Sequence, residues 1–272
     1  MTEPRTALDA IGVLPDTEID IADAALQLAR VDAPDADWQS ASAHLSALAR
    51  DAAALATLDT LPARVEALGD LLVERHGYAG DDRTYDDLAN ANLIRVIERR
   101  RGLPVALGIL WLHTARAAGW AAHGVDFPAH FLISLHGAGG STVLDVFHGG
   151  APLGTAELRV LLRRVEGESA ELRPGLLRPM SARGVLLRLQ NNIATRRMAA
   201  GDLTGTLDCV TDMLRIAPDQ AELWQQAGVM NHRLDRVGAA LRCFDRFLGL
   251  VPQGAAADRI RATVEQLRRH LN

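Results

Sequence analysis

The sequence predicts an α+β domain followed by an all-α repeat segment, and three observations support that prediction. Apolar residues recur at helical spacing through most of residues 20–120. Two short apolar runs on either side of the glycine-rich stretch Gly137–Gly140 are typical of a β-hairpin. From residue 187 onward, the chain matches itself at a spacing of 34 residues. Helices packed on one face of a small antiparallel sheet make an α+β domain, and the repeat indicates a separate helical array.

Three helices are expected in the N-terminal part of the chain. Ala22–Arg30 carries leucines and alanines at helical spacing, and Trp38–Leu58 has its leucines on one side. Pro62–Arg75 begins with proline in its first turn, a favoured position because the amide hydrogen there has no partner within the helix. The stretch Gly77–Asp82 is expected to be a loop.

The densest pattern follows this loop. Asn92–Arg101 is predicted to be helical and to stop at Gly102. Pro104 can begin the next helix, Val105–Ala118, which ends at Gly119, a residue suited to a helix C-terminus. The predicted strands are an extended stretch that starts at Val125–Pro128 and the two hairpin runs Phe131–Leu135 and Thr142–Phe147.

The C-terminal part predicts two tetratricopeptide-type repeats. Pro218 and Pro252 lie 34 residues apart, which is the period of that helix-turn-helix unit. The same spacing separates Cys209 from Cys243, on apolar helix faces where cysteine behaves as a small hydrophobic residue. The alternative is two amphipathic hairpins that share a spacing. Two further pairs keep the period, Leu207 with Leu241 and Leu214 with Leu248.

The second repeat has the clearer signature. Gly228 and Ala240 are small where two helices must approach, and Phe244 is aromatic where successive repeats meet. The first repeat has Gln190 and Arg197 at positions that usually carry bulky apolar residues. It is therefore a degenerate copy.

These elements predict two domains. About three repeats are needed to bury a continuous helical core, so a capping helix at Asp258–Leu271 or the preceding domain is expected to supply the missing surface. The expected divisions are a domain of residues 1–178, with a helical part at about 20–75 and a core at about 76–165, and a segment of residues 179–272 with repeats at about 187–220 and 221–253.

Composition and charge exclude several classes of protein. The net charge of −5 and the pI of 6.0 give no electrostatic reason to expect nucleic acid as a partner. No apolar run reaches the roughly 20 residues that span a bilayer, and residues 1–5 lack the basic-then-apolar order of a secretory signal. Two cysteines are too few for a disulfide scaffold. We expect a cytoplasmic protein without nucleic acid or membrane partners.

Four short motifs in combination resemble one family. They are Arg100–Pro104, Ala115–Gly119, Phe127–Phe131, and Leu144-Asp145 with Phe147–Gly150. In this order they resemble the SirB-like branch of the transglutaminase-like superfamily, and the resemblance covers roughly Asp20 to Leu271. That branch joins a papain-like α+β domain to C-terminal tetratricopeptide repeats, so the resemblance implies the same arrangement here.

The resemblance also implies a candidate site. In active members of the superfamily, a cysteine that opens a helix works with a histidine on the next strand and an aspartate on the strand after it. By motif, His130 matches the histidine and Asp145 the aspartate, which assigns them as a residual catalytic pair. The cysteine position carries Pro104, and no cysteine precedes Cys209, so the standard thioester mechanism is excluded. The SirB-like branch generally shows this departure.

Each polar residue also has a structural interpretation. His130 could be a buried histidine hydrogen-bonded to Asp145, and Asp145 could cap the amides of Gly149–Gly150. His148 lines the same cleft or occupies a turn, and the turn is favoured. We expect no metal, because the spacing matches no established ligand pattern. No cofactor is expected either, since Gly137–Gly140 lacks the lysine and the strand-to-helix context of a phosphate loop.

Two functions from different classes follow. The first is a non-catalytic binding, adaptor or regulatory protein that holds a protein or peptide through its repeats or its cleft. The second is an enzyme acting on peptide or amide bonds, in which His130 and Asp145 activate water or an amine by general-base catalysis. The absent nucleophile and the repeats favour the first. The repeats could also dock on the N-terminal domain instead of binding a partner.

Overall fold

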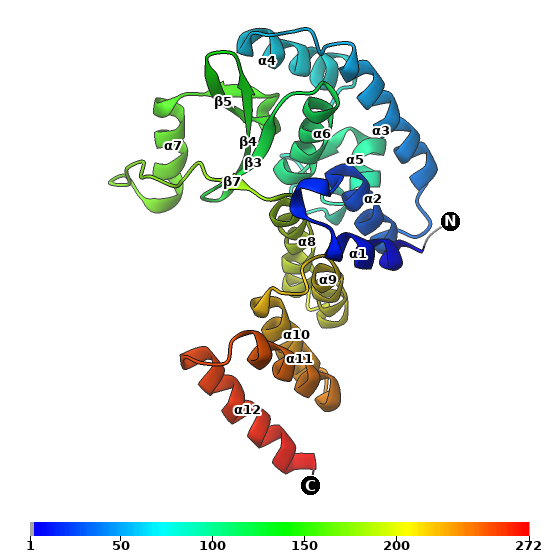
Figure 1. Cartoon of the computed structure of the whole chain (residues 1–272), viewed down its shortest axis with the longest axis vertical. Coiled ribbons are helices and arrows are strands. Elements are labelled where there is room, and N and C mark those ends of the chain that lie inside the picture. The colour runs from blue at the N-terminus through cyan, green and yellow to red at the C-terminus, as the bar shows by residue number, and fades with distance from the viewer. Residues whose placement is uncertain (1–2, 272) are drawn as a thin grey trace. The chain divides into compact units, whose positions relative to one another are not determined.

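The structure is a computed structural model that describes residues 3–271, and it contains two compact units (Figure 1). One unit is the continuous stretch Leu14–Leu189. The other joins the N-terminal residues as far as Val13 to the residues from Gln190 onward. The expected first domain, residues 1–178, included that N-terminal segment, whereas the structure groups it with the C-terminal helices.

The unit Leu14–Leu189 is mainly helical in its first half, as expected. Asp20 accepts hydrogen bonds from the amides of Ala22 and Asp23 and so caps the first long helix. Asp37 caps the next helix in the same way. The helices are η1 (Asp16–Glu18), α2 (Ile21–Asp32), α3 (Trp38–Ala53), α4 (Leu61–Gly69), the π-helical turn η2 (Asp70–Arg75), η3 (Leu88–Asn90), α5 (Leu93–Arg99) and α6 (Pro104–Ala117).

The predicted hairpin is confirmed and belongs to a five-stranded antiparallel sheet. β4 (His130–Gly137) pairs with β5 (Gly140–Asp145) across the glycine-rich turn. The sheet has the order β6-β5-β4-β3-β7, with β3 at Ala122–Phe127, β6 at Ala151–Leu153 and β7 at Pro179–Met180. A separate parallel pair joins β1 (Ala79–Gly80) to β2 (Arg101–Gly102).

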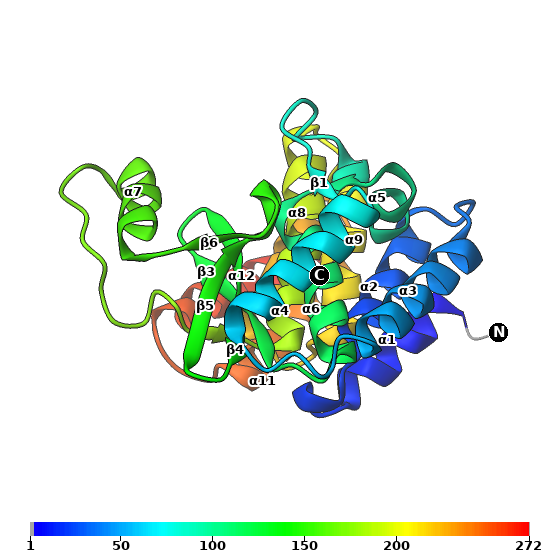
Figure 2. The same cartoon turned by 90° about the horizontal axis from the view of Figure 1, so that it is seen from above.

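Helices cover both faces of this sheet rather than the single face expected. On one face, the ring of Phe131 in β4 packs against Gly108 of the buried helix α6, where no larger residue fits. On the other face, Val125, Phe127 and Leu132 form a core cluster with Leu158 and Leu162 of α7 (Thr155–Glu166). Figure 2 shows the strands between α6 and α7. The continuous buried run Phe131–Leu135 reflects this double covering, because a strand buried on both sides shows no alternation of apolar and polar residues.

The C-terminal helices form the predicted repeats. Two helical hairpins are followed by a last helix that contributes Ile260, Val264 and Leu267 to the core around Phe244. An N-terminal helix, α1 (Pro4–Val13), which the sequence pattern did not predict, packs on α9. The others are α8 (Ala182–Ala199), whose first half lies in the other unit, α9 (Leu203–Ile216), α10 (Ala221–Arg233), α11 (Val237–Leu250) and α12 (Ala255–Leu271).

The 34-residue period extends to individual side-chain contacts. Arg197 Nη1 donates to Cys209 Sγ at 3.5 Å, and Asn231 Nδ2 donates to Cys243 Sγ at 3.9 Å. Donor and acceptor each shift by one repeat between the two contacts, so both cysteines hold equivalent places in the packing. Gly228 lies against the ring of Phe244, where an added Cβ would overlap that ring. The small residue therefore sets how closely α10 and α11 approach.

Candidate functional site

Helix α6 begins where the resemblance places a nucleophile. Pro104 is its first residue and is half-buried, while Leu103 before it is buried. The amide of Leu103 donates to the Asn90 carbonyl oxygen at 2.8 Å, which fixes the start of the helix. Proline suits this first position, and the first turn, Leu103–Leu107, contains no thiol or hydroxyl.

His130 and Asp145 lie at the same end of two neighbouring strands. His130 begins β4 and Asp145 ends the antiparallel neighbour β5, in a register that pairs Ile133 with Leu144. His130 is half-buried, and this burial lowers the pKa of its imidazole, while the negative charge of Asp145 acts in the opposite direction. The two side chains therefore interact electrostatically.

The hydrogen bonds of Asp145 go to its own turn rather than to His130. Its Oδ2 lies 2.7 Å from His148 Nδ1. Its Oδ1 accepts from the amides of Phe147 at 3.1 Å and His148 at 3.3 Å, which caps the short helix η4 (Val146–His148). The side chain of Asp145 thus caps Phe147 and His148, while its backbone carbonyl oxygen accepts from the amide of Gly150 at 2.8 Å. The catalytic role assigned to His130 and Asp145 stays a prediction.

Asp145 and His148 form an oriented acid–imidazole pair. The carboxylate of Asp145 is buried, whereas the side chain of His148 is 70% exposed. A carboxylate that holds Nδ1 leaves Nε2 of an imidazole available for a proton or a hydrogen bond from a ligand. This pair can orient a bound polar group, and it can act as a general base if a substrate reaches it.

Aromatic residues pack around the pair. The ring of Phe147 lies against Gly80, where a Cβ would overlap it, and meets the exposed ring of Tyr85 edge-on at 5.9 Å. Gly150, with a φ of 77°, lies against the buried ring of Trp111 in α6. These contacts fix the turn that carries His148.

A polar cavity of about 450 Å³ borders this region. It is lined by residues 79–84 and Arg101, and so shares Gly80 with the Phe147 contact. Hydrogen bonds from Thr84 lower the pKa of Asp81 to about 2, and Arg99 Nη2 lies 3.1 Å from its Oδ2. Charges of both signs line the cavity, since Arg83 and Arg101 lie there with Asp81 and Asp82. In residues 3–271, no three histidine, cysteine, aspartate or glutamate side chains are grouped to hold a metal ion.

With this geometry established, two stretches of the chain match family models. Residues 39–191 match the transglutaminase-like superfamily, and residues 193–265 match the tetratricopeptide repeat. The chain therefore belongs to the transglutaminase-like superfamily, in the class whose transglutaminase-like domain is followed by tetratricopeptide repeats.

Its curated relatives include UPF0162 proteins, the SirB-like family. The chain is 31% identical over 209 residues to the UPF0162 protein of Xylella fastidiosa strain Temecula1, covering 76% of this chain and 74% of that protein. It is 27% identical over 251 residues to the UPF0162 protein of Vibrio cholerae, covering 92% and 93%. F-box only protein 21 of Mus musculus is 33% identical over 84 residues, which is 30% of this chain and 13% of that protein. The resemblance inferred from the motifs is confirmed.

Sequence reasoning missed the partnership of Asp145 with His148. Aspartate followed three residues later by histidine, just before two glycines, is the pattern of a capped turn whose last side chain folds back on the carboxylate. The motif comparison directed attention to His130 instead. The ring contacts of Tyr85 and Phe147 had no local signal, because 62 residues separate them in the sequence (147 minus 85).

Proposed function

We propose that this protein is a non-catalytic, cytoplasmic adaptor whose degenerate transglutaminase-like domain and tetratricopeptide repeats hold a protein or peptide partner. The observation that supports this most directly is the start of α6. There, Pro104 occupies the position that the family resemblance assigns to the nucleophile, and the first turn contains no thiol or hydroxyl. Tetratricopeptide repeats support a role in protein–protein interaction, since their stacked hairpins form extended binding surfaces. No helix in the described part of the chain is long and apolar enough to cross a membrane.

Affinity capture from the source cell's lysate tests this proposal. The baits are the full-length chain, a variant of the acid–imidazole pair, His148→Ala, and a repeat variant, Val229→Asp, which alters an apolar side chain 38% exposed on α10. His232→Ala, an exposed change on the same helix, is the matched control. An adaptor retains one reproducible partner with the control and loses it with one of the first two variants. Failure of every bait to enrich a partner would remove the adaptor role.

A second candidate rests on the acid–imidazole pair. The 2.7 Å contact between Asp145 and the exposed His148 is the geometry of an oriented general base. An enzyme acting on peptide or amide bonds would therefore lose activity in His148→Ala. The measurement is hydrolysis of a peptide library by the wild-type chain, His148→Ala and His130→Ala. Product formation that survives both substitutions would exclude these histidines as the base.

A further inference from the structure

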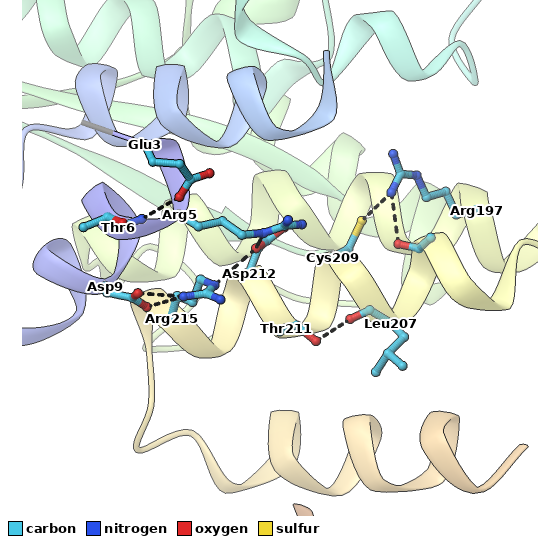
Figure 3. A network of polar contacts seen from close by, with 11 residues as sticks. Glu3, Arg5, Thr6, Asp9, Arg197, Leu207, Cys209, Thr211, Asp212 and Arg215 are labelled. Atoms are coloured by element: carbon cyan, nitrogen blue, oxygen red, sulfur yellow. Dashed lines mark hydrogen bonds and ion pairs between the residues drawn. The ribbon is translucent and has the colours of Figure 1, made fainter. Parts of the chain in front are cut away.

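The N-terminal helix α1 is held on α9 by two ion pairs (Figure 3). Arg5 Nε lies 3.0 Å from Asp212 Oδ1. One helical turn further along, Arg215 Nη1 lies 2.6 Å from Asp9 Oδ1. Each helix therefore contributes one basic and one acidic residue, so the charges complement each other in only one orientation.

Helix α1 also buries apolar side chains next to these pairs. Leu8 is fully buried and Ile11 nearly so, and they are the buried side chains of α1. At Gly12, an added Cβ would overlap the carbonyl oxygen of Arg215, so the backbone of α1 comes very close to the end of α9. The surface thus recognises an arginine, a leucine and an aspartate at positions i, i+3 and i+4 of a helix.

Asp212 of α9, which is buried while α1 is in place, favours a ligand of this kind. The side chain of Asp212 is only 2% exposed, and a buried carboxylate is costly unless a positive group pairs with it. Arg215 on the same helix lies 3.6 Å away, while Arg5 makes the shorter contact from α1. A basic side chain supplied by the docked helix completes the pairing.

The docked helix is short and its end is open. An isolated helix of ten residues is marginal in water, so the contacts with α9 hold α1 in its helical form. Val13 at its end is 82% exposed. Next to it is a cavity of about 440 Å³ between α1, the end of α9 and Trp224, which α1 leaves unfilled. A longer helix would find further apolar contact there.

We propose that this face of α9 is a helix-docking site, occupied in the free protein by the chain's own N-terminal helix. The partner that fits it is an amphipathic helix carrying arginine, leucine and aspartate at the positions of Arg5, Leu8 and Asp9. The identity of an outside partner depends on the proposed adaptor function, whereas the docking surface itself can be tested without it. Because α1 is tethered and the partner is not, displacement depends on partner concentration.

The test uses full-length chains and a fluorescein-labelled peptide of residues 3–14, read by fluorescence anisotropy. Leu8→Asp in the chain removes the buried side chain of its own α1 and opens the site. We expect this chain to bind the wild-type peptide at least tenfold more tightly than the wild-type chain, whose own α1 competes. Equal affinity for the two chains, or no binding to either, would overturn the proposal. Circular dichroism confirms folding, and Arg5→Glu replaces Leu8→Asp if that chain is unfolded.

A charge exchange shows that the peptide binds in the orientation of α1. In the opened chain, Arg215→Glu is expected to weaken peptide binding at least fivefold, and a peptide carrying Asp9→Arg is expected to restore it. If neither change alters the affinity, the peptide binds elsewhere and the proposed site is wrong. If the peptide docks as expected but lysate capture finds no partner, the adaptor function fails while this site stands. If Leu8→Asp does not change the capture of a partner, the adaptor function is retained but the partner binds a different surface.

Discussion

Arg100 Nη1 donates a hydrogen bond of 2.7 Å to His44 Nε2, so the imidazole must keep that nitrogen unprotonated. Arg100 is the left-handed residue that ends α5, with a φ of 57°, and its guanidinium also donates to the Tyr78 hydroxyl and lies over that ring. Burial, followed by the charges of Arg100 and His76, lowers the pKa of His44 to about 4. Burial raises the pKa of Tyr78 to about 12.

Stability is therefore expected to fall in mild acid. The folded-state pKa of His44 lies below its unfolded value of about 6.5, so unfolding takes up a proton between these values. The contribution of neutral His44 to the free energy of unfolding is complete above about pH 6.5 and is lost as the pH falls toward 4. We expect a loss of about 1–2 kcal/mol, reduced from the full shift because the side chain is half exposed. Urea unfolding at pH 7.5, 6 and 5 measures it. His44→Gln should flatten this part of the profile, and an unchanged slope in that variant would contradict the assignment.

Gly150→Ala is expected to destabilise the transglutaminase-like unit by about 2–4 kcal/mol. The new Cβ would overlap the buried ring of Trp111, and the φ of 77° already disfavours a side chain. Gly149→Ala is the matched control, since its φ is 75° but its Cβ would meet open space. Gly149→Ala should lower the free energy of unfolding by only about 1 kcal/mol. Similar losses in the two variants, measured by urea unfolding, would show that the ring contact is unimportant.

Asp16→Ala should weaken the start of α8. Its carboxylate accepts hydrogen bonds from the amides of Ala182 at 2.8 Å and Arg183 at 2.9 Å, so it acts as a capping group from a distant part of the sequence. Loss of a capping side chain costs about 1–2 kcal/mol. Glu18→Ala, in the same short helix and exposed, should change the thermal midpoint little. An equal shift in both variants would refute the capping role.

Substitutions of Asp145 and of His148 should differ in their effects on stability. Asp145→Ala leaves the amides of Phe147 and His148 without their acceptor and should cost about 1–2 kcal/mol. His148→Ala removes an exposed side chain and should cost less than about 1 kcal/mol. Thermal unfolding of the two variants measures this difference. If His148→Ala were the more damaging change, the imidazole would have a structural role that its exposure does not indicate.

The sequence predicted those elements whose signals are local. The helices at residues 22–30 and 62–75 and the hairpin around Gly137–Gly140 follow from periodicity and glycine placement, and the structure confirms them. The predicted helix Trp38–Leu58 ends earlier, at Ala53. The repeat was visible in the sequence because equivalent positions 34 residues apart, such as Cys209 and Cys243, make equivalent contacts.

Elements that depend on distant partners could not be predicted. Helix α1 has only Leu8 and Ile11 to bury, and its position depends on Asp212, 207 residues after Arg5. Strand β7 has two residues, the first of them Pro179, and forms only because β3 offers an edge to pair with. The same reason applies to the candidate site. Residue type and spacing identified Asp145, but they did not show that its carboxylate contacts His148.

The placement of α1 with α9 has a consequence for biosynthesis. Helix α1 leaves the ribosome before α9, and the Asp212 that pairs with Arg5 is made 207 residues later. At bacterial elongation rates of about 5–20 residues per second, this delay is about 10–40 s. During that interval Leu8 and Ile11, the buried side chains of α1, lack the α9 surface on which this helix packs. Helix α1 therefore reaches its place in the fold only after α9 has been made.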